Sequence, residues 1–374
     1  MGLRIKDKPS EIMDRSSPPW QNAVMALKPF LCAIALSSLA VNPVPAQAQV
    51  ASSDQPEDLG ELSFDAYLQL LIARARAEGV SEATLQRMTS DLTPNDRVIR
   101  LDRAQPGTPT RSGYPALAPY IAIHVNSVRI AGGREVFAAN RAALLAVEAE
   151  YGVPAEVIIA IFGHETSYGR IRGNFDLARS LATLAWEGRR RELFANEFIA
   201  LMKVADKGYG REELVGSWAG AMGNPQFLPS IYLKLARDGD GDGRANIFTN
   251  RADTFASIAN YLRYAGWRTG QPWGVPATVA DDLDIDALKT RLVAPVCPRV
   301  HERHSQWKTV AEWRALGVMA QRMIGDDVLA TLFQPDGPGT PAWLLTSNYR
   351  AILEYNCSNY YAMSVGLLAD EIAR

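Results

Sequence analysis

The sequence predicts a mainly α-helical protein with a small β-containing insertion. Apolar residues recur at spacings of three and four along most of the chain, which is the period of an amphipathic helix. Residues 269–308 lack this period and are rich in Pro, Val and Thr, so a few short strands are expected there and in residues 340–347. The 374 residues are 47% hydrophobic and 21% charged, which excludes a disordered or collagen-like chain.

The first 48 residues are predicted to be a secretory signal peptide. An apolar run over residues 30–41 has the length of a signal core, and Ala-Gln-Ala at 46–48 has the small-x-small pattern of a cleavage site. Translation can begin at Met25, because the stretch before it is unusually long for the start of a signal. An N-terminal membrane anchor is the alternative, but the run is short for a spanning helix. Cleavage would deliver the mature chain to the periplasm.

The remainder of the chain divides into a linker and one long folded region. Residues 49–60 are polar and predicted to be the linker, and residues 61–374 are predicted to fold, with the small β-containing subdomain inside 269–347. No apolar run in the mature chain is long enough to span a bilayer. The net charge of −2 and pI of about 6.2 give no basic field for a nucleic acid partner. Cys297 and Cys357 would lie in an oxidising compartment, where pairing stays open.

Helical periodicity is the main local signal in the folded region. The predicted helices are 63–89, 120–131, 134–151, 154–169, 177–206, 226–237, 252–266, 309–316 and 348–373. Gly152 is expected to end one of these helices and Pro154 to begin the next at its first helical position. Residues 93–119 contain five prolines and few apolar repeats, so they are predicted to be a long loop.

The helix after Pro154 ends in a glutamate on its apolar face. Ile158, Ile161 and Glu165 lie on one face by their spacing. A carboxyl group at that place loses hydration, which disfavours its charged form and raises its pKa. A glutamic acid that is protonated near neutral pH can protonate a glycosidic oxygen. A glutamate that reaches solvent, or one paired with Arg170, is the alternative, and this helix alone leaves both open.

Other catalytic motifs are not found. A zinc-binding H-E-x-x-H motif needs a second histidine at the position of Tyr168, and the chain has only four histidines. Neither G-x-S-x-G, a P-loop nor G-x-G-x-x-G occurs, so a serine hydrolase or a nucleotide-binding protein lacks support. The sequence therefore predicts no cofactor for the chemistry.

Residues 216–230 are a segment of small residues in which glycines and prolines are frequent. Such a loop lets the backbone approach a ligand closely. It contains Gln226 and Phe227, and an amide beside an aromatic ring suits a sugar, which has apolar faces and polar rims. A tight turn between packed helices is the alternative.

Several motifs follow one another in a fixed order from about residue 60 to the end of the chain. They are Glu165-Thr-x-x-Gly169, Ser217-x-Ala-Gly-Ala-Met-Gly-x-x-Gln-Phe-x-Pro-Ser230, an acidic glycine loop from Asp238, Ala259-Asn-Tyr-Leu262 with Gly266-Trp267, and Tyr355-Asn-Cys-Ser-Asn-Tyr-Tyr-Ala362. Together they resemble the lytic murein transglycosylase B family. The resemblance implies a lysozyme-like helical catalytic core that cleaves the glycan strands of peptidoglycan.

The resemblance also implies a set of site residues. Glu165 would be the sole catalytic acid and base. The residues implied to bind substrate are Ser217, Gln226, Phe227, Tyr261, Tyr355, Asn356 and Tyr361. One departure is His164, because the residue before the glutamate is commonly apolar in the family.

The implied reaction breaks the MurNAc-β-1,4-GlcNAc bond without water. Glu165 would protonate the linking oxygen and then, as a carboxylate, accept the proton of the muramyl 6-hydroxyl, which closes to a 1,6-anhydro-MurNAc end. A hydrolytic muramidase and a non-catalytic peptidoglycan-binding protein are the alternatives, and the intact glutamate argues against the second. Glycan strands are the implied partner, and protein partners leave no readable pattern.

Residues 238–249 fit the start of an EF-hand calcium loop. The candidate ligands are Asp238, Asp240 and Asp242 at positions 1, 3 and 5, the carbonyl of Arg244, Asn246 at position 9 and Thr249 at position 12. Position 12 normally holds a bidentate glutamate, so Thr249 should weaken binding unless Asp253 reaches back from a longer loop. Relatives in the family carry such a loop with calcium, which would be structural. A turn stabilised by its own hydrogen bonds is the alternative.

Overall fold

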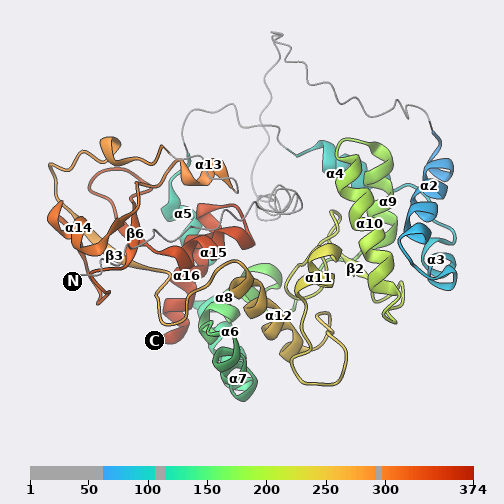
Figure 1. The fold of residues 1–374 in the computed structure, drawn as a ribbon, viewed down its shortest axis with the longest axis horizontal. Coiled ribbons are helices and arrows are strands. Elements are labelled where there is room, and N and C mark those ends of the chain that lie inside the picture. Colours follow the sequence, from blue (N-terminus) through green and yellow to red (C-terminus); the bar gives the residue numbers. More distant parts are fainter. Residues whose placement is uncertain (1–61, 106–113, 292–296) are drawn as a thin grey trace, which may run out of the picture.

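The computed structural model describes residues 62–105, 114–291 and 297–374. The predicted signal peptide and linker lie outside the described residues. A large helical region with one apolar core makes up most of the molecule, and a small sheet with its own core lies at one end (Figure 1). The predicted mainly α class is therefore confirmed. Among the described helices, none combines the length and the apolar character needed to cross a bilayer.

The described chain has the following helices and strands. The helices are α2 (Phe64–Ala77), α3 (Glu82–Thr89), α4 (Asp96–Arg103), α5 (Leu117–His124), α6 (Ser127–Ala139), α7 (Arg141–Tyr151), α8 (Ala155–Thr166), α9 (Leu177–Glu187), α10 (Arg191–Ala205), α11 (Pro229–Leu235), α12 (Arg251–Tyr264), η2 (Asp286–Leu288), α13 (Pro298–His301), α14 (Val310–Ala315), α15 (Ser347–Tyr355) and α16 (Asn359–Ala373). The strands are β1 (Phe175–Asp176), β2 (Val215–Gly216), β3 (Gly274–Val279), β4 (Lys308–Thr309), β5 (Val318–Ala320), β6 (Leu329–Phe333) and β7 (Ala342–Leu345).

The prediction of a continuous loop over residues 93–119 is wrong, because α4 lies within it. The Asn95 side chain accepts hydrogen bonds from the first backbone N–H groups of α4 and so begins the helix. The other anchor is Asp102, which is fully buried and paired with Arg190 and Arg189. This short polar helix is stabilised by an ion pair with arginines that are distant in sequence, so it has no apolar periodicity that would predict it.

The helix break expected near residues 132–133 is also wrong, since both glycines lie inside α6. The chain turns instead at Asn126 and Asn140, on either side of that helix. A Cβ atom on Gly133 would lie 2.5 Å from Cδ1 of Ile372, and one on Gly132 would lie 2.9 Å from the Tyr168 ring. These glycines therefore permit close packing of α6 against its neighbours.

Four other predicted helices are divided or shortened. The helix predicted over residues 63–89 is divided into α2 and α3, with Gly79, whose φ is 89°, between them. Gly188, with φ of 96°, separates α9 from α10, and residues 356–358 separate α15 from α16. The helix predicted from residue 226 begins only at Pro229, because Gln226 has a left-handed backbone with φ of 51°. The divisions follow from single residues with positive φ or extended backbone, which a periodicity over long windows does not resolve.

Helix α8 lies at the centre of the helical region and packs against α6, α7, α12 and α16. Pro154 is its N-cap residue and thus lies one position earlier than predicted. The helix ends at Thr166, and the backbone is left-handed from Ser167 through Gly169, the predicted end. Because nearly every side chain of α8 is buried, its last turn is held rigidly by the core.

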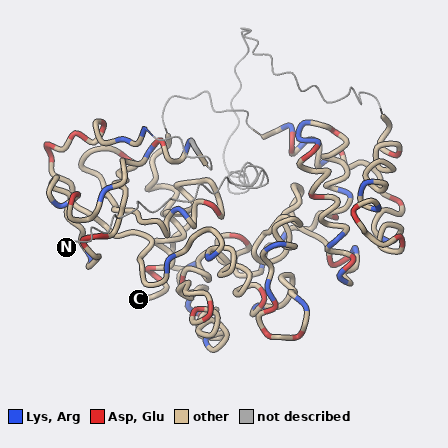
Figure 2. Tube along the Cα trace, viewed as in Figure 1, with Lys and Arg blue, Asp and Glu red and all other residues tan. Residues whose placement is uncertain are grey.

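The second architectural element is a five-stranded antiparallel sheet with the order β4-β6-β7-β3-β5. It lies between residues 274 and 345, and Trp313, Leu332 and Leu344 are completely or almost completely buried in its core. Strands β3 and β7 fall where short strands were expected, whereas β5 and β6 form in residues 318–333, which lie inside the predicted β-containing subdomain but had no strand predicted. In Figure 2, basic and acidic residues are interspersed through both regions.

A disulfide bond joins Cys297 to Cys357, with the two Cα atoms 5.4 Å apart. The sequence left this pairing open. The bond attaches the segment before α13 to the junction between α15 and α16.

Candidate active site

Glu165 occupies the last turn of α8, where the apolar face of the helix ends. Ile158 and Ile161 on that face are fully buried, and the glutamate itself is partly buried. Its Oε1 atom accepts a hydrogen bond of 2.8 Å from the phenol of Tyr361, which comes from α16. The Nε of Arg170, the alternative partner, donates to the Ser167 carbonyl at 3.0 Å. The carboxyl group is therefore held by a neutral donor from a distant part of the chain.

Two further tyrosines lie near this carboxyl group. The ring centroids of Tyr261 and Tyr355 are 4.6 Å apart, and their hydroxyls donate to the Glu354 and Pro225 carbonyls, each at 2.7 Å. Burial, and then the charge of Glu165, raise the pKa of Tyr355 well above its usual value. Both phenols remain neutral donors at any physiological pH, so they fix the geometry without adding charge.

Phe227 lies within the same aromatic cluster, with its centroid 5.7 Å from Tyr261 and 6.1 Å from Tyr355. Its side chain is fully buried, as is that of Tyr355. In this arrangement the Phe227 ring packs against the tyrosines. Direct contact of Phe227 or Tyr355 with a sugar stays a prediction.

The segment that contains Ser217 and Gln226 is a compact turn. Strands β1 and β2 pair just before it, and the Ser217 hydroxyl accepts a 2.9 Å bond from the Ala221 N–H. The Gln226 amide donates to the Gly223 carbonyl at 2.8 Å and to the Arg172 carbonyl at 3.3 Å. The second of these bonds ties the turn to the loop that follows Glu165. The geometry is thus that of a tight turn, and it brings Ser217 and Gln226 to the same end of α8.

Asn356 lies at the C-terminal end of α15 in extended backbone conformation and is buried. It is the residue between Tyr355 and the disulfide-bonded Cys357. The disulfide therefore restrains the short junction that contains Asn356, with Tyr355 at the end of α15 before it and Tyr361 in the first turn of α16 after it.

The acidic glycine loop brings together a set of carboxylates that differs from the predicted one. Carboxylate oxygens of Asp238, Asp240 and Asp253 lie within 4.8 Å of one another. Asp253 is fully buried and accepts bonds from the N–H groups of Gly239 at 2.7 Å and Asn246 at 2.5 Å. Burial raises its pKa, and the two other aspartates act in the same direction. Asp253 thus reaches back into the loop, as the sequence allowed.

The other predicted ligands of this loop make internal hydrogen bonds. Asp242 accepts from the N–H of Arg244 at 2.8 Å, and the Thr249 hydroxyl accepts from the Asn246 amide at 2.8 Å. Three converging carboxylates fit the oxygen ligands that a hard cation such as calcium prefers. The residues present therefore suit a cation held by Asp238, Asp240 and Asp253.

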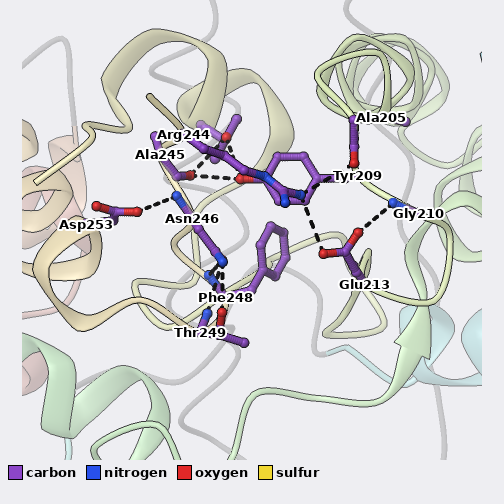
Figure 3. A network of polar contacts seen from close by, with 12 residues as sticks. Ala205, Tyr209, Gly210, Glu213, Arg244, Ala245, Asn246, Phe248, Thr249 and Asp253 are labelled. Atoms are coloured by element: carbon purple, nitrogen blue, oxygen red, sulfur yellow. Dashed lines mark hydrogen bonds and ion pairs between the residues drawn. The ribbon is translucent and has the colours of Figure 1, made fainter. Parts of the chain in front are cut away.

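The same acidic loop also contacts the 216–230 turn of the candidate site. Figure 3 shows Arg244 lying against the ring of Tyr209, at 3.8 Å from its centroid, with Nη2 3.4 Å from an oxygen of Glu213. The Ile247 carbonyl then accepts a 2.8 Å bond from the N–H of Asn224, two residues before Gln226. The loop is thus linked both to residues just before the 216–230 segment and to Asn224 within it.

Sequence reasoning missed Glu354, a second acidic residue beside the tyrosines. Burial raises the pKa of Glu354 to about 7, and the charge of Arg350 opposes that rise. It precedes Tyr355 in α15, and its backbone carbonyl accepts the Tyr261 bond. No local pattern singles out this residue, because its burial comes from the packing of α15 on other elements.

Known proteins are similar to this chain in sequence and in fold. Residues 63–370 match the family model described as "Transglycosylase SLT domain". The chain is 30% identical over 314 residues to the membrane-bound lytic murein transglycosylase B of Escherichia coli (strain K12), covering 82% of each chain.

Two solved structures are also similar. The first is SltB3 from Pseudomonas aeruginosa in complex with NAG-anhNAM-pentapeptide, at 34% identity and a TM-score of 0.75, with 84% of this chain and 80% of that chain covered. The second is the Escherichia coli lytic transglycosylase Slt35 in complex with calcium, at 29% identity and a TM-score of 0.68, with coverage of 82% and 92%. The predicted family resemblance and the lysozyme-like fold are therefore confirmed.

Proposed function

Because this chain belongs to the transglycosylase SLT family and is a lytic transglycosylase of the murein B type acting on peptidoglycan, we propose that it cleaves the MurNAc-β-1,4-GlcNAc bond without water and leaves 1,6-anhydro-MurNAc ends. The observation that carries this proposal is the Glu165 carboxyl at the end of a buried apolar helix, with the Tyr361 phenol on its Oε1 atom at 2.8 Å.

The first step is proton transfer to the glycosidic oxygen. With the Tyr361 phenol on Oε1, the acidic proton of Glu165 is carried on Oε2 and passes to the oxygen that links the two sugars. The bond between that oxygen and the muramyl anomeric carbon breaks, and positive charge develops on the sugar. The phenol stabilises the carboxylate that remains, because hydrogen bonds to a charged acceptor are stronger than those to a neutral one.

The second step uses the same side chain as a base. The Glu165 carboxylate accepts the proton of the muramyl 6-hydroxyl, and that oxygen bonds to the anomeric carbon to close the anhydro ring. Atoms balance without water, and Glu165 returns to its protonated form. The complex of SltB3 with an anhydro-muramyl pentapeptide supports the same product for this chain.

Product analysis tests this function directly. We expect the purified enzyme to release muropeptides from peptidoglycan sacculi with anhydromuramyl ends, which are about 18 Da lighter than the hydrolytic products because no water is added. Mass spectrometry of the soluble fragments distinguishes the two. Reducing muramyl ends as the main product would identify a hydrolytic muramidase and overturn the proposal.

We further infer that the predicted signal peptide exports the chain to the periplasm, where its glycan substrate lies. The relative in Escherichia coli is named as membrane-bound, which supports a location at the cell envelope. The disulfide between Cys297 and Cys357 agrees with an oxidising compartment.

We also propose that the acidic loop binds a structural calcium ion through Asp238, Asp240 and Asp253. The calcium-bound structure of Slt35 and the convergence of these three carboxylates support it. When bound, the ion would supply positive charge that relieves the repulsion among the aspartates, and it takes no part in bond cleavage. The catalytic steps need only the residues near Glu165.

A calcium titration checks this site. We expect millimolar calcium to raise the Tm by about 2–4 °C, because an ion that binds only the folded state stabilises it. Asp240→Asn should remove the shift, since it deletes a carboxylate from the cluster. Asp286→Asn, which changes an aspartate ion-paired to Lys289 outside the loop, should keep it. Equal shifts in both variants, or none in the wild type, would exclude the site.

A further inference from the structure

His164 precedes Glu165 in α8, and its side chain contacts α16. Its Nδ1 atom lies 2.9 Å from the Ala160 carbonyl oxygen, and its Nε2 atom lies 2.7 Å from the Ser364 hydroxyl. Ser364 is fully buried and follows Tyr361 by one helical turn. The histidine is therefore joined, through one side chain, to the turn of α16 that brings the Tyr361 phenol to Glu165.

The direction of these hydrogen bonds is fixed by the charge state of the imidazole. Burial, with a smaller effect from the charge of Arg129, lowers the pKa of His164 to about 3, so the ring is neutral and carries one N–H. The Ala160 carbonyl can only accept, which places the hydrogen on Nδ1. Nε2 must then accept from Ser364. The Tyr361 carbonyl lies 2.9 Å from the same hydroxyl, but the single serine hydrogen is used by the histidine.

The imidazole ring also packs directly on the tyrosine. Its centroid is 5.5 Å from that of Tyr361, with the ring planes at 74°, which is an edge-on contact. On another side it stacks on His124 of α5 at 5.9 Å, and His124 stacks on Tyr120 at 3.9 Å. The ring is held on both sides, so it offers Tyr361 a fixed surface.

We propose that His164 is a positioning residue for the reaction, which fixes the Tyr361 phenol on the Glu165 carboxyl through its bond with Ser364 and its contact with the tyrosine ring. This inference rests on the proposed function of Glu165. The histidine touches neither the substrate nor the reacting atoms. It acts by limiting the movement of the α16 turn relative to the end of α8. This fixed geometry is needed in both proton transfers.

A double-mutant cycle between His164 and Tyr361 tests the proposal. His164→Phe keeps an aromatic ring but removes the acceptor for Ser364. We expect it to lower kcat for anhydromuropeptide release by about tenfold with little change in KM, and to move the pH profile of kcat in the same direction as Tyr361→Phe. In the Tyr361→Phe background the same change should lower kcat by less than about twofold, because the phenol it positions is already gone.

Three further variants separate positioning from a loss of stability. Ser364→Ala should reproduce the effect of His164→Phe and add nothing to it, whereas His164→Gln, which keeps an acceptor, should lie closer to the wild type. His301→Phe removes another histidine whose pKa is lowered by burial, but one that lies in α13 with its ring against His304, and should leave kcat unchanged. Melting temperatures of all variants show whether each one is folded.

Two outcomes would overturn the inference. One is a fall in kcat for His164→Phe that is equally large with and without the Tyr361 phenol. The other is a fall in rate with an unchanged pH profile, which indicates a purely structural role. Both outcomes apply when the wild-type enzyme forms anhydro ends. If the wild type forms none, the proposed function itself fails, so the two failures are distinguishable.

Discussion

The Glu165→Gln variant is expected to release anhydromuropeptides from sacculi between about 10² and 10⁴ times more slowly than the wild type. A glutamine amide keeps an oxygen that can accept the 2.8 Å bond from Tyr361, so the local fold should be retained. It has no acidic proton for the glycosidic oxygen and no carboxylate to accept one from the 6-hydroxyl. Since one side chain serves in both steps, both are lost together. The measurement is the initial rate of product release, quantified by mass spectrometry.

Glu156→Gln is the matched control for this experiment. It makes the same chemical change in the first turn of the same helix, about two and a half turns from Glu165. Removing a negative charge near a helix N-terminus costs only about 0.3–1 kcal/mol of stability, so activity should stay within about twofold of the wild type. If the Glu165→Gln enzyme digested sacculi at the rate of this control, another group would have to be the acid.

Acidification from about pH 7 to pH 5 is expected to lower the free energy of unfolding by several kcal/mol. Burial lowers the pKa of His164 and His301 to about 3 and that of His304 to about 4. Below the unfolded value of about 6.5 the unfolded chain binds protons that the folded chain does not. The stabilisation by each neutral histidine is therefore complete above that pH and is lost as the pH falls towards the folded pKa, by up to about 1.4 kcal/mol per pH unit.

Buried carboxyl groups with a raised pKa, which include Glu354, Glu197 and Asp253, act in the opposite direction. The pKa of Glu354 is raised by burial to about 7, so the folded chain takes up its proton before the unfolded chain does. Protonation of Glu354 therefore raises the free energy of unfolding as the pH falls from about 7 to the ordinary glutamate pKa of about 4.3. This gain offsets the loss from about one histidine. We expect the three histidines to outweigh these carboxyl groups, so the net change on acidification is a loss.

Urea unfolding at pH 7, 6 and 5 measures this effect. Glu354→Gln removes one compensating group and should make the loss on acidification steeper, whereas His164→Phe removes one titrating histidine and should make it shallower. A free energy of unfolding that is constant over this pH range, or that rises as the pH falls, would contradict the prediction.

Local patterns determined much of this protein. The 3.6-residue period located most of the helices, because a helix that buries one face has apolar residues at spacings of three and four within a short window of sequence. The same period indicated that an apolar face ends at Glu165. The motifs at 216–230 and 355–362 identified the family, and the structure brings both to the end of α8.

Other features depend on contacts between distant residues. Helix α4 is stabilised by the buried pair of Asp102 with Arg190, and the carboxylates that converge in the acidic loop include Asp253, which lies beyond the predicted position 12. Strands β5 and β6 pair with other strands of the sheet, so neither leaves a strong pattern of its own. Each of these features needs a partner residue or strand in a distant segment whose own sequence shows no pattern that would indicate it.

The sequence by itself therefore determined the class of fold and the family, and through the family motifs it predicted Glu165 as the acid, because these motifs are residue types at short spacings. Only the tertiary structure decided which groups meet that acid. The Tyr361 phenol lies 196 positions from Glu165 along the chain, and the His164–Ser364 bond spans 200. Hydrogen bonds act over about 3 Å, and residues about 200 positions apart come that close only after the helices have packed.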